Sequence, residues 1–529
     1  MRRWAGLDMS KKKKLTYTSL LDNKDINSGY EHALEMVQRE FGQHHPIYIG
    51  GRRVAAVEEF ETRSPIDADL VIGTFQKGGG HETRSAIDEA TESFPAWSQT
   101  EWEERVRIVR AIADGIEKQN FSLSALMTYE AGKNRFEALA EVCEAVEMVR
   151  YNCAIYEERE GFTLPMSEVT GERSVSTMRP YGVWAVISPF NFPLVLAAGM
   201  VSAALLTANT VVFKPTSKAP LTGLKLHAAC MQAGVPGGVL NVITGPGAPF
   251  GATVVAHPDV AGIAFTGSRD AGMWLQRNFS ICQTYHKPFV AEMGSKNPAI
   301  VTASADLDKA VEGVLKGAFG YGGQKCSATS RVYVESAVAP EFIERLRAAT
   351  EKTVVGDPRK SDVFVGPLID RAALAKFTDA VKDGLRGGGA VVSGGTVLRG
   401  GAWNSGCYVR PTIMTGLPRG HRLFEQELFV PFLLVDTITS LEDGLREANA
   451  TEYGLTAGIF SEDDDEVERF FTSAQFGVCY ANRRGGATTG AWPGVQPFGG
   501  WKASGFTGKG VGGPYYLLSY VREQTRTRA

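Results

Sequence analysis

The feature that most constrains the fold is a regular alternation of apolar strand patterns and helix patterns between Tyr181 and Glu292. The runs GVWAVIS, NTVVFKP, GVLNVITG, AGIAFTG and KPFVAEM are typical of buried strands, and helix-like segments separate them. Strands that alternate with helices in this way predict βαβ units and a parallel, doubly wound sheet. We therefore expect an α/β fold.

Ligands bind such sheets beyond the carboxyl ends of the strands, where the connecting turns lie. Here those turns are ISPFNFP, FKPTSKAP, ITGPGAPFG and FTGSRD. They are rich in Gly, Ser, Thr, Asn and Lys, as phosphate- and ribose-binding turns are. The nearest segment to a GxGxxG fingerprint runs from Gly245 to Gly251 and has one residue too many before its last glycine, so it is weak evidence by itself.

A second α/β unit is predicted between Ala305 and about Asn482. Apolar residues at helical spacing alternate there with β-rich runs. The expected helices cover 307–319, 339–352, 371–386, 441–450 and 465–474, and the expected strands are RVYVE, AVVSGG, PFLLVDTI, TAGIFS and GVCYAN.

The flanking segments differ from these two units. Residues 46–75 predict small strands at the edge of a domain, and the pattern from 81 to 157 is helical. Residues 161–180 predict a hairpin around Thr170 and Gly171. YYLLSYVREQTRT, near the end of the chain, predicts an exposed strand whose edge needs a partner, which favours a homodimer or a higher homo-oligomer.

Length and composition exclude several classes of protein. The 529 residues are too many for one simple core, and a net charge of −3 gives no reason to expect a nucleic-acid or membrane partner. The 7 cysteines include no CxxC pair, so neither a disulfide scaffold nor a metal site is indicated, and a reducing cytoplasm fits best. The basic N-terminal segment lacks the apolar core of a secretory signal, which leaves only a short organelle-targeting segment open, and we expect no transmembrane helix.

One cysteine lies in an unusual setting. Cys326 stands in the small, polar loop of FGYGGQKCSATSR, between a predicted helix and a predicted strand. The glycines before it allow a close turn and keep bulk away from the sulfur. An open thiol beside Lys325 would ionise and act as a nucleophile. A loop cysteine without a chemical role is the alternative that this segment alone leaves open.

Motifs spread along nearly the whole chain, from about Pro46 to Thr527, settle this choice in combination. They are SPFNFP, FKP, FTGS, AEMGSKNP, GQKCSATSR, EQELFVPF, EYGLTAGIFS and PFGGWKASG. In this order they resemble the NAD(P)-dependent aldehyde dehydrogenase superfamily. GQKCSATSR, AEMGSK, TTGAWPGVQPFGG and the ending GGPYYLLSYV are most similar to the family of 1-pyrroline-5-carboxylate dehydrogenases within it.

The resemblance implies an aldehyde dehydrogenase-like fold with three parts: a Rossmann-type NAD-binding domain, an α/β catalytic domain and a small oligomerisation β-extension. The expected boundaries are 1–45 for an N-terminal tail and helix, 46–160 and 181–292 for the NAD-binding domain, 161–180 and 514–529 for the oligomerisation strands, and 293–513 for the catalytic domain.

The resemblance also implies the catalytic residues. Cys326 would add to the aldehyde and be left as a thioester after hydride transfer to the nicotinamide. Asn191 matches the amide of the oxyanion hole, which works with the backbone N–H of Cys326. Glu292 matches the base that activates water against the thioester. Read without the resemblance, Asn191 would be an ordinary loop or cap residue and Glu292 a structural ion-pair partner.

For the cofactor, Lys214 matches the lysine at the adenine ribose, Ser268 the pyrophosphate contact, Glu427 the nicotinamide-ribose carboxylate and Phe429 the ring beside the nicotinamide. The complete implied set is Ser188, Pro189, Phe190, Lys214, Ser217, Gly247, Gly251, Phe265, Thr266, Gly267, Ser268, Gly294, Glu427 and Phe429.

Two positions depart from the superfamily's usual pattern around the cofactor. Ser217 stands where many strictly NAD-dependent relatives carry Glu, so we expect NAD as the main acceptor with measurable use of NADP. Val430 replaces a usual Gly, which puts the local backbone and the pose of Phe429 in question.

For the substrate, the resemblance implies that Ser327 and the backbone of Gly490 and Ala491 hold a carboxylate. Phe192 and Phe498 would sandwich an aliphatic chain. Glu144, on a predicted helix, would meet an amine, or it is simply an exposed helix carboxylate. Trp492 and Pro493 depart from the family's usual residues, so the anchor loop is expected to be shaped differently.

The implied reaction is NAD-dependent oxidation of L-glutamate 5-semialdehyde, formed from 1-pyrroline-5-carboxylate, to L-glutamate in proline degradation. A separate proline dehydrogenase would act upstream. Another short aliphatic aldehyde or semialdehyde is the alternative substrate. Glu292 argues against an acylating enzyme, and the presence of Cys326, Glu292 and Asn191 together argues against a catalytically silent protein.

Overall fold

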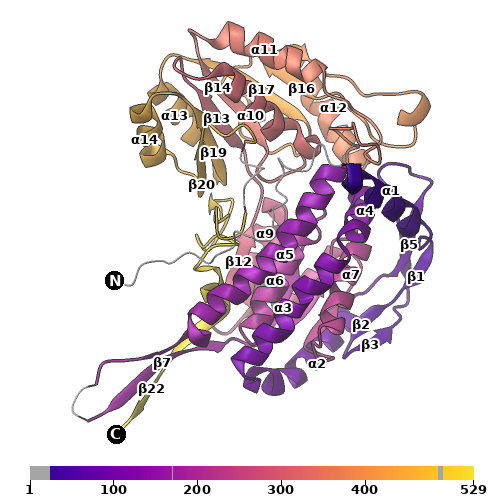
Figure 1. The fold of residues 1–529 in the computed structure, drawn as a ribbon, viewed down its shortest axis with the longest axis vertical. Coiled ribbons are helices and arrows are strands. Elements are labelled where there is room, and N and C mark those ends of the chain that lie inside the picture. Colours follow the sequence, from indigo (N-terminus) through magenta and orange to yellow (C-terminus); the bar gives the residue numbers. More distant parts are fainter. Residues whose placement is uncertain (1–23, 169–170, 487–491) are drawn as a thin grey trace.

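A computed structural model describes residues 24–168, 171–486 and 492–529 (Figure 1). Its first large sheet has seven strands in the order β12-β11-β8-β9-β10-β2-β3. The strands predicted from the alternating apolar runs form its parallel centre, and β2 joins β10 in the antiparallel direction. The bounds are β2 (Ile47–Ile49), β3 (Arg52–Val54), β8 (Val183–Ile187), β9 (Thr210–Lys214), β10 (Leu240–Val242), β11 (Val260–Thr266) and β12 (Phe289–Glu292).

Helices bury both faces of this sheet, because successive strand side chains point to opposite sides. On β8, Trp184 and Val186 join the apolar core that also contains residues of α3–α7, whereas Val183 and Ala185 join the core formed with α2, α8 and α9. The bounds are α2 (Gly80–Gln99), α3 (Trp102–Lys118), α4 (Asn120–Ala131), α5 (Arg135–Glu158), α6 (Val195–Leu206), α7 (Pro220–Gln232), α8 (Gly247–Ala256) and α9 (Arg269–Cys282). The doubly wound prediction is confirmed.

The second large sheet also has seven strands, in the order β15-β16-β17-β14-β13-β19-β20. They are β13 (Asn297–Val301), β14 (Thr329–Glu335), β15 (Ala390–Ser393), β16 (Thr412–Thr415), β17 (Phe432–Ile438), β19 (Thr456–Phe460) and β20 (Val478–Ala481). The accompanying helices lie close to the predicted ranges: α10 (Leu307–Phe319), α11 (Ala339–Glu351), α12 (Arg371–Arg386), α13 (Leu441–Asn449) and α14 (Asp464–Ser473).

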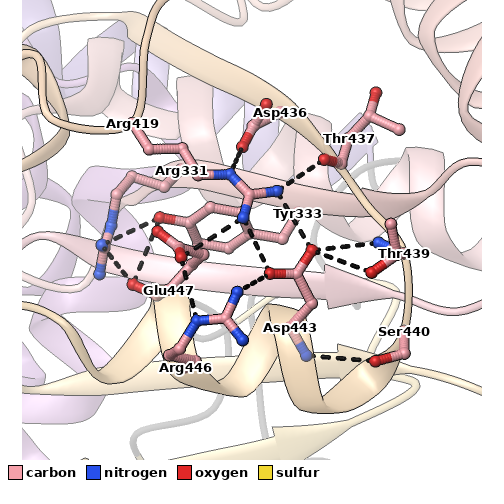
Figure 2. A network of polar contacts seen from close by, with 10 residues as sticks. All are labelled: Arg331, Tyr333, Arg419, Asp436, Thr437, Thr439, Ser440, Asp443, Arg446 and Glu447. Atoms are coloured by element: carbon pink, nitrogen blue, oxygen red, sulfur yellow. Dashed lines mark hydrogen bonds and ion pairs between the residues drawn. The ribbon is translucent and has the colours of Figure 1, made fainter.

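A polar network fixes α13 against this second sheet (Figure 2). The guanidinium of Arg419 donates to Asp436 of β17 at 2.7 Å and to Asp443 of α13 at 2.8 Å. Arg331 of β14 donates to the backbone carbonyls of Glu447 and Ala448, at the end of the same helix, at 3.2 and 3.1 Å. The network therefore holds β14, the strand that follows the Cys326 loop, against the end of α13.

Smaller elements complete the fold. A three-stranded sheet packs β1 (Gln43–His45) and β4 (Glu59–Arg63) on either side of β5 (Val71–Gln76), and β18 (Tyr453–Gly454) pairs with β21 (Trp501–Lys502). Helix α1 (Lys24–Gln38) contacts α4. None of the helices in the described part of the chain is long and apolar enough to cross a membrane.

A narrow sheet projects from the body, where β22 and β7 run together (Figure 1). It contains β6 (Thr163–Pro165), β7 (Arg173–Pro180) and β22 (Val521–Arg528), in the order β22-β7-β6. The predicted hairpin in 161–180 is present, although its turn residue Thr170 lies outside the described residues.

The predicted final strand over YYLLSYVREQTRT is wrong in its first half. Tyr516–Tyr520 form a 3₁₀ helix, and the strand begins only at Val521. The physical reason is burial: the ring of Tyr520 packs 4.4 Å from that of Trp184, and its hydroxyl meets that of Tyr516 at 2.7 Å. An exposed edge strand could not bury these aromatic rings in the core.

Candidate active site

Cys326 lies in a tight turn between the 3₁₀ helix η2 (Gly320–Gly323) and β14. Tyr321, Gly322 and Gly323 all have positive φ, at 51, 62 and 67°. A Cβ atom on Gly323 would lie 2.6 Å from the carbonyl oxygen of Val430, so only glycine fits this turn without movement. The turn places the cysteine where the first sheet's β12 ends.

The thiol of Cys326 donates to Oε1 of Glu292, the last residue of β12, at 3.1 Å. Burial raises the pKa of Glu292 to about 7, and the contact with Cys326 lowers it only in part. Burial and the adjacent Glu292 carboxylate raise the pKa of Cys326 well above its usual value. At neutral pH the proton therefore rests on the sulfur, beside a carboxylate that accepts protons near pH 7.

The structure contradicts the expectation that Lys325 helps to ionise the thiol. Its ammonium is buried and pairs with Oε1 of Glu137 on α5 at 2.6 Å. Since that charge is already matched by a carboxylate, Glu292 is the group placed to take the proton of Cys326.

Asn191 is 3% exposed and lies in the loop that leaves the carboxyl end of β8. This loop is anchored at its far side, where Oε1 of Glu141 accepts the backbone N–H groups of Leu194 and Val195 at 2.8 and 3.1 Å. A second contact holds Phe192, whose ring centroid lies 3.6 Å from Nζ of Lys133. Lys133 and Glu141 are both fully buried and form an ion pair of 2.5 Å.

A cavity of about 30 Å³ lies beside Glu292, between β11, β12 and the Gly-rich segment near the C-terminus. That is room for about two water molecules, since one occupies about 10–15 Å³ by this measure. Its wall includes Thr266, Phe498, Gly505 and Tyr516. The arrangement gives the partly buried carboxylate of Glu292 access to a space that can hold water.

Several residues of the implied cofactor set, among them Lys214 for the adenine ribose, lie at the carboxyl ends of β8, β9 and β10. Lys214 ends β9, is 4% exposed, and donates to the carbonyl of Pro215 at 3.0 Å, and burial lowers the pKa of its amine to about 8. The Cβ position of Gly247 is 3.9 Å from Cε of this lysine. Ser188 carries a buried hydroxyl that has no hydrogen-bond partner among the described residues. Ser217 donates its hydroxyl to the carbonyl of Gly245 at 2.6 Å.

Ser268, the residue expected at the pyrophosphate, follows β11, and other residues of the implied cofactor set lie nearby in the sequence. Ser268 caps α9, since its hydroxyl accepts the N–H of Ala271 at 3.4 Å. Phe265 and Thr266 end β11, Gly267 follows, and Gly251 lies one turn into α8. A cleft of about 720 Å³ is lined by the start of α9, by Lys376 and by Glu427.

Glu427 and Phe429, expected at the nicotinamide end, come from the second sheet's side. Glu427 lies so close to Gly294 that a Cβ atom there would come within 2.1 Å of its Oε2. Burial raises the pKa of Glu427 to about 7. Phe429 has a φ of 60°, and its ring lies 5.9 Å from that of Phe190, the neighbour of Pro189. Val430, which stands where a glycine is usual, is buried. The positive φ in this segment belongs to Phe429 and not to Val430.

The predicted substrate residues divide into three groups. Phe498 belongs to the apolar cluster against which Cys326 packs, and Ser327 is 6% exposed directly after the cysteine. Phe192 meets Tyr321 edge to face at 6.5 Å, while Glu144 lies half-buried on α5. Gly490 and Ala491 lie outside the described residues.

Sequence reasoning assigned no role to several buried residues that hold these loops. They are Lys133, Glu137, Glu141, Ser295 and Asn297. The ion pair of Glu137 with Lys325 joins residues 188 positions apart and leaves no local pattern. Ser295 and Asn297, by contrast, lie inside the AEMGSKNP motif, which is the signal that could have indicated them.

A partly buried cysteine beside a partly buried carboxylate, between a doubly wound sheet and a second α/β unit, indicates a class of thiol-dependent oxidoreductases with a dinucleotide-type domain. The family model of the aldehyde dehydrogenase family matches residues 53–526. This chain belongs to the aldehyde dehydrogenase family.

Individual proteins show the same similarity over their full lengths. The chain is 36% identical to the 1-pyrroline-5-carboxylate dehydrogenase of Bacillus licheniformis, over 95% of this chain and 96% of that protein. A solved structure of 1-pyrroline-5-carboxylate dehydrogenase from Thermus with bound NAD superposes with a TM-score of 0.91 at 32% identity, covering 96% of this chain and 97% of that one. An Escherichia coli NADP-dependent enzyme superposes with a TM-score of 0.86 at 31% identity, covering 93% and 98%.

Proposed function

We propose that this protein oxidises L-glutamate 5-semialdehyde to L-glutamate with NAD, as a 1-pyrroline-5-carboxylate dehydrogenase. The observation that carries the reaction type is the 3.1 Å contact between the Cys326 thiol and Glu292. The similarity to enzymes of that name, over 95% of this chain in the B. licheniformis case, supports the substrate.

In the proposed reaction, Cys326 gives its proton to Glu292 and the thiolate adds to the aldehyde carbon. The Asn191 amide and the backbone N–H of Cys326 stabilise the oxyanion of the thiohemiacetal. NAD, when bound, supplies the acceptor for the hydride whose loss leaves a thioester on the sulfur. Glu292 must first release to solvent the proton that it took from Cys326, after which its carboxylate takes a proton from the water that attacks the thioester carbon. Collapse of that adduct breaks the C–S bond, so glutamate leaves and the thiolate of Cys326 is restored.

The residues at the first sheet fit a dinucleotide. The buried Ser188 hydroxyl, which has no hydrogen-bond partner in the part of the chain that the structure describes, the buried Lys214 amine and the start of α9 all lie at the carboxyl ends of the strands. A helix start favours phosphate, and Glu427 lines the same cleft, where it would hold the nicotinamide ribose.

The specificity for NAD over NADP is proposed to be incomplete. Ser217 is small and neutral, and its hydroxyl is already bound to Gly245, so no carboxylate stands at this position to repel a 2′-phosphate. Measured kcat/KM values for both cofactors test this: a clear preference for NAD with a measurable rate on NADP is expected, and strict NAD dependence or equal rates would contradict it.

For the substrate, Ser327 with Gly490 and Ala491 would bind the carboxylate, Phe192 and Phe498 the aliphatic chain, and Glu144 the amine. A panel of glutamate semialdehyde, succinate semialdehyde and propanal separates this proposal from its alternative. Glutamate semialdehyde should give the highest kcat/KM. A higher value for another short aldehyde would move the assignment to that substrate.

The oligomeric state, the domain boundaries and the cellular location are also part of what we propose. We propose that the sheet of β22, β7 and β6, with β22 exposed at its edge, joins copies of this chain into a homodimer or higher homo-oligomer, which sedimentation would test. The domain boundaries predicted above, a cytoplasmic location and a separate proline dehydrogenase upstream belong to this proposal too.

A further inference from the structure

The turn that carries Cys326 is held by one buried side-chain amide. Asn297, the first residue of β13, is 1% exposed, and its Nδ2 donates to the carbonyl oxygen of Cys326 at 2.7 Å and to that of Ala328 at 2.9 Å. Its Oδ1 accepts the N–H of Thr456 at 2.9 Å and the hydroxyl of Ser295. Both donor and both acceptor positions of the amide are therefore in use.

Ser295 continues this chain of contacts toward the cofactor side. It is 4% exposed, and while its hydroxyl donates to Asn297, its backbone N–H donates to Oε1 of Glu427 at 2.8 Å. Glu427 is thus linked to the carbonyl of Cys326 through the backbone N–H and the hydroxyl of Ser295 and then through the side-chain amide of Asn297. We call this chain of contacts the Ser295–Asn297 bridge.

The surroundings leave this bridge little room to move independently. The pairing of β13 with β14 shifts directly after Asn297, which faces Thr329 while Pro298 faces Arg331. Arg331 locks the segment from the other side, since its guanidinium donates to the carbonyl of Lys296 at 2.7 and 3.1 Å. The network of Figure 2 in turn fixes Arg331. A displacement at Ser295 therefore reaches the nucleophile turn rather than being absorbed by the loop.

We propose that Ser295 and Asn297 are positioning residues that couple the cofactor carboxylate Glu427 to the nucleophile turn of Cys326. The proposal rests on the roles proposed above for Cys326 and Glu427. Ser295 holds one carboxylate oxygen of Glu427, and through Asn297 it also holds the backbone carbonyl of Cys326. The position of the cofactor carboxylate and the position of the Cys326 sulfur therefore depend on each other.

The first test removes the amide that holds the turn. Asn297→Ala should lower kcat by about 100-fold, as expected for a misplacement of the reacting group by about 1 Å. It should slow alkylation of Cys326 by iodoacetamide, with the KM for NAD changed less than kcat. The assay uses whichever aldehyde the wild-type enzyme oxidises fastest, so a wrong substrate assignment does not affect it, and the alkylation rate needs no substrate.

Asn241→Ala is the matched control. Asn241 is fully buried in β10, accepts the N–H of Gly50 at 2.8 Å and donates to the carbonyl of Gly238 at 2.7 Å, remote from Cys326 in the first sheet. Both variants lose a buried amide, but only Asn297→Ala should lose activity and thiol reactivity. Equal kcat and equal alkylation rates in the two variants would overturn the positioning role.

The second test isolates the coupling through Ser295. Ser295→Ala removes the hydroxyl link but keeps the backbone N–H that binds Glu427 and the bonds from Asn297 to Cys326. The effects of Glu427→Gln and Asn297→Ala on kcat should be non-additive in the wild-type background and additive when Ser295→Ala is present. Additive effects in the wild-type background, or the same non-additivity in both, would overturn the coupling. If Asn297→Ala fails to fold, Asn297→Ser enters the same cycle.

Discussion

Replacing Glu292 by glutamine should remove activity and at the same time stabilise the protein at alkaline pH. Burial raises the pKa of Glu292 from its ordinary value of 4.5 to about 7. Above pH 7 the folded protein must hold a negative charge on this partly buried, desolvated carboxyl, which costs about 3 kcal/mol for a pKa difference of this size. The native state binds the proton more tightly than the unfolded chain, so this carboxyl makes the fold less stable as pH rises from about 4.5 to 7.

Urea unfolding of wild type and Glu292→Gln at pH 5 and pH 8 measures this directly. The variant should gain up to about 3 kcal/mol at pH 8 and less than about 1 kcal/mol at pH 5. Its kcat should fall by about 10²–10⁴-fold, because a general base is lost. In the wild type, kcat/KM should rise with pH up to about 7, and this limb should be absent from the residual activity of the variant.

A matched control is Glu130→Gln. Glu130 is fully buried, burial raises its pKa to about 7, and its carboxylate accepts backbone N–H groups of α7, remote from Cys326. Its substitution should leave kcat within about twofold of wild type. If Glu292→Gln were as active as this control, or were no more stable at pH 8 than at pH 5, the reasoning about the buried base would be refuted.

Three further substitutions test other parts of the account. Asn191→Ala should lower kcat by about 10²–10³-fold in steady-state assays, since one oxyanion donor is lost, and an unchanged kcat would remove Asn191 from the mechanism. Lys325→Met should cost about 3–5 kcal/mol in urea unfolding, because it leaves the buried Glu137 without its 2.6 Å ion pair; the double variant with Glu137→Leu should recover much of that loss, and no recovery would contradict the assignment. Ser217→Glu should raise the kcat/KM preference for NAD over NADP by about 10-fold or more through repulsion of the 2′-phosphate, and an unchanged ratio would place the discrimination elsewhere.

The alternation of strands and helices was the part of the fold that the sequence predicted well. The central strands of the first sheet bury both faces, so each is a short apolar run that local patterns reveal. β13 was missed because Pro298 interrupts its pattern. β16 was also missed, although β15 and β20, which have the same length of four residues, were predicted. The start of β22 was misplaced because Tyr516 and Tyr520 are β-prone residues that pack in the core instead.

At the site, the motifs located the groups with chemistry but not the groups that hold them. The contact of Cys326 with Glu292 joins residues 34 positions apart and depends on two sheets meeting. The pairing of Lys325 with Glu137 joins residues 188 positions apart, so no local pattern indicated that its charge was already matched. Lys325 was therefore wrongly predicted to help ionise the Cys326 thiol, because its long-range ion pair with Glu137 is not visible in the sequence.

The central claim is that Cys326 becomes acylated during turnover. In Glu292→Gln the thiol of Cys326 can still lose its proton slowly to solvent and form the thioester, whereas hydrolysis of the thioester loses its general base, so the acyl-enzyme should accumulate. This variant can be mixed with NAD and glutamate semialdehyde, incubated for longer than several slow turnovers, quenched in acid and examined by peptide mass spectrometry. We predict a glutamyl adduct on the peptide containing Cys326, one NADH released per adduct, and neither product in Cys326→Ala. NADH formation with no adduct on Cys326, or an adduct on another of the 7 cysteines, would contradict the account.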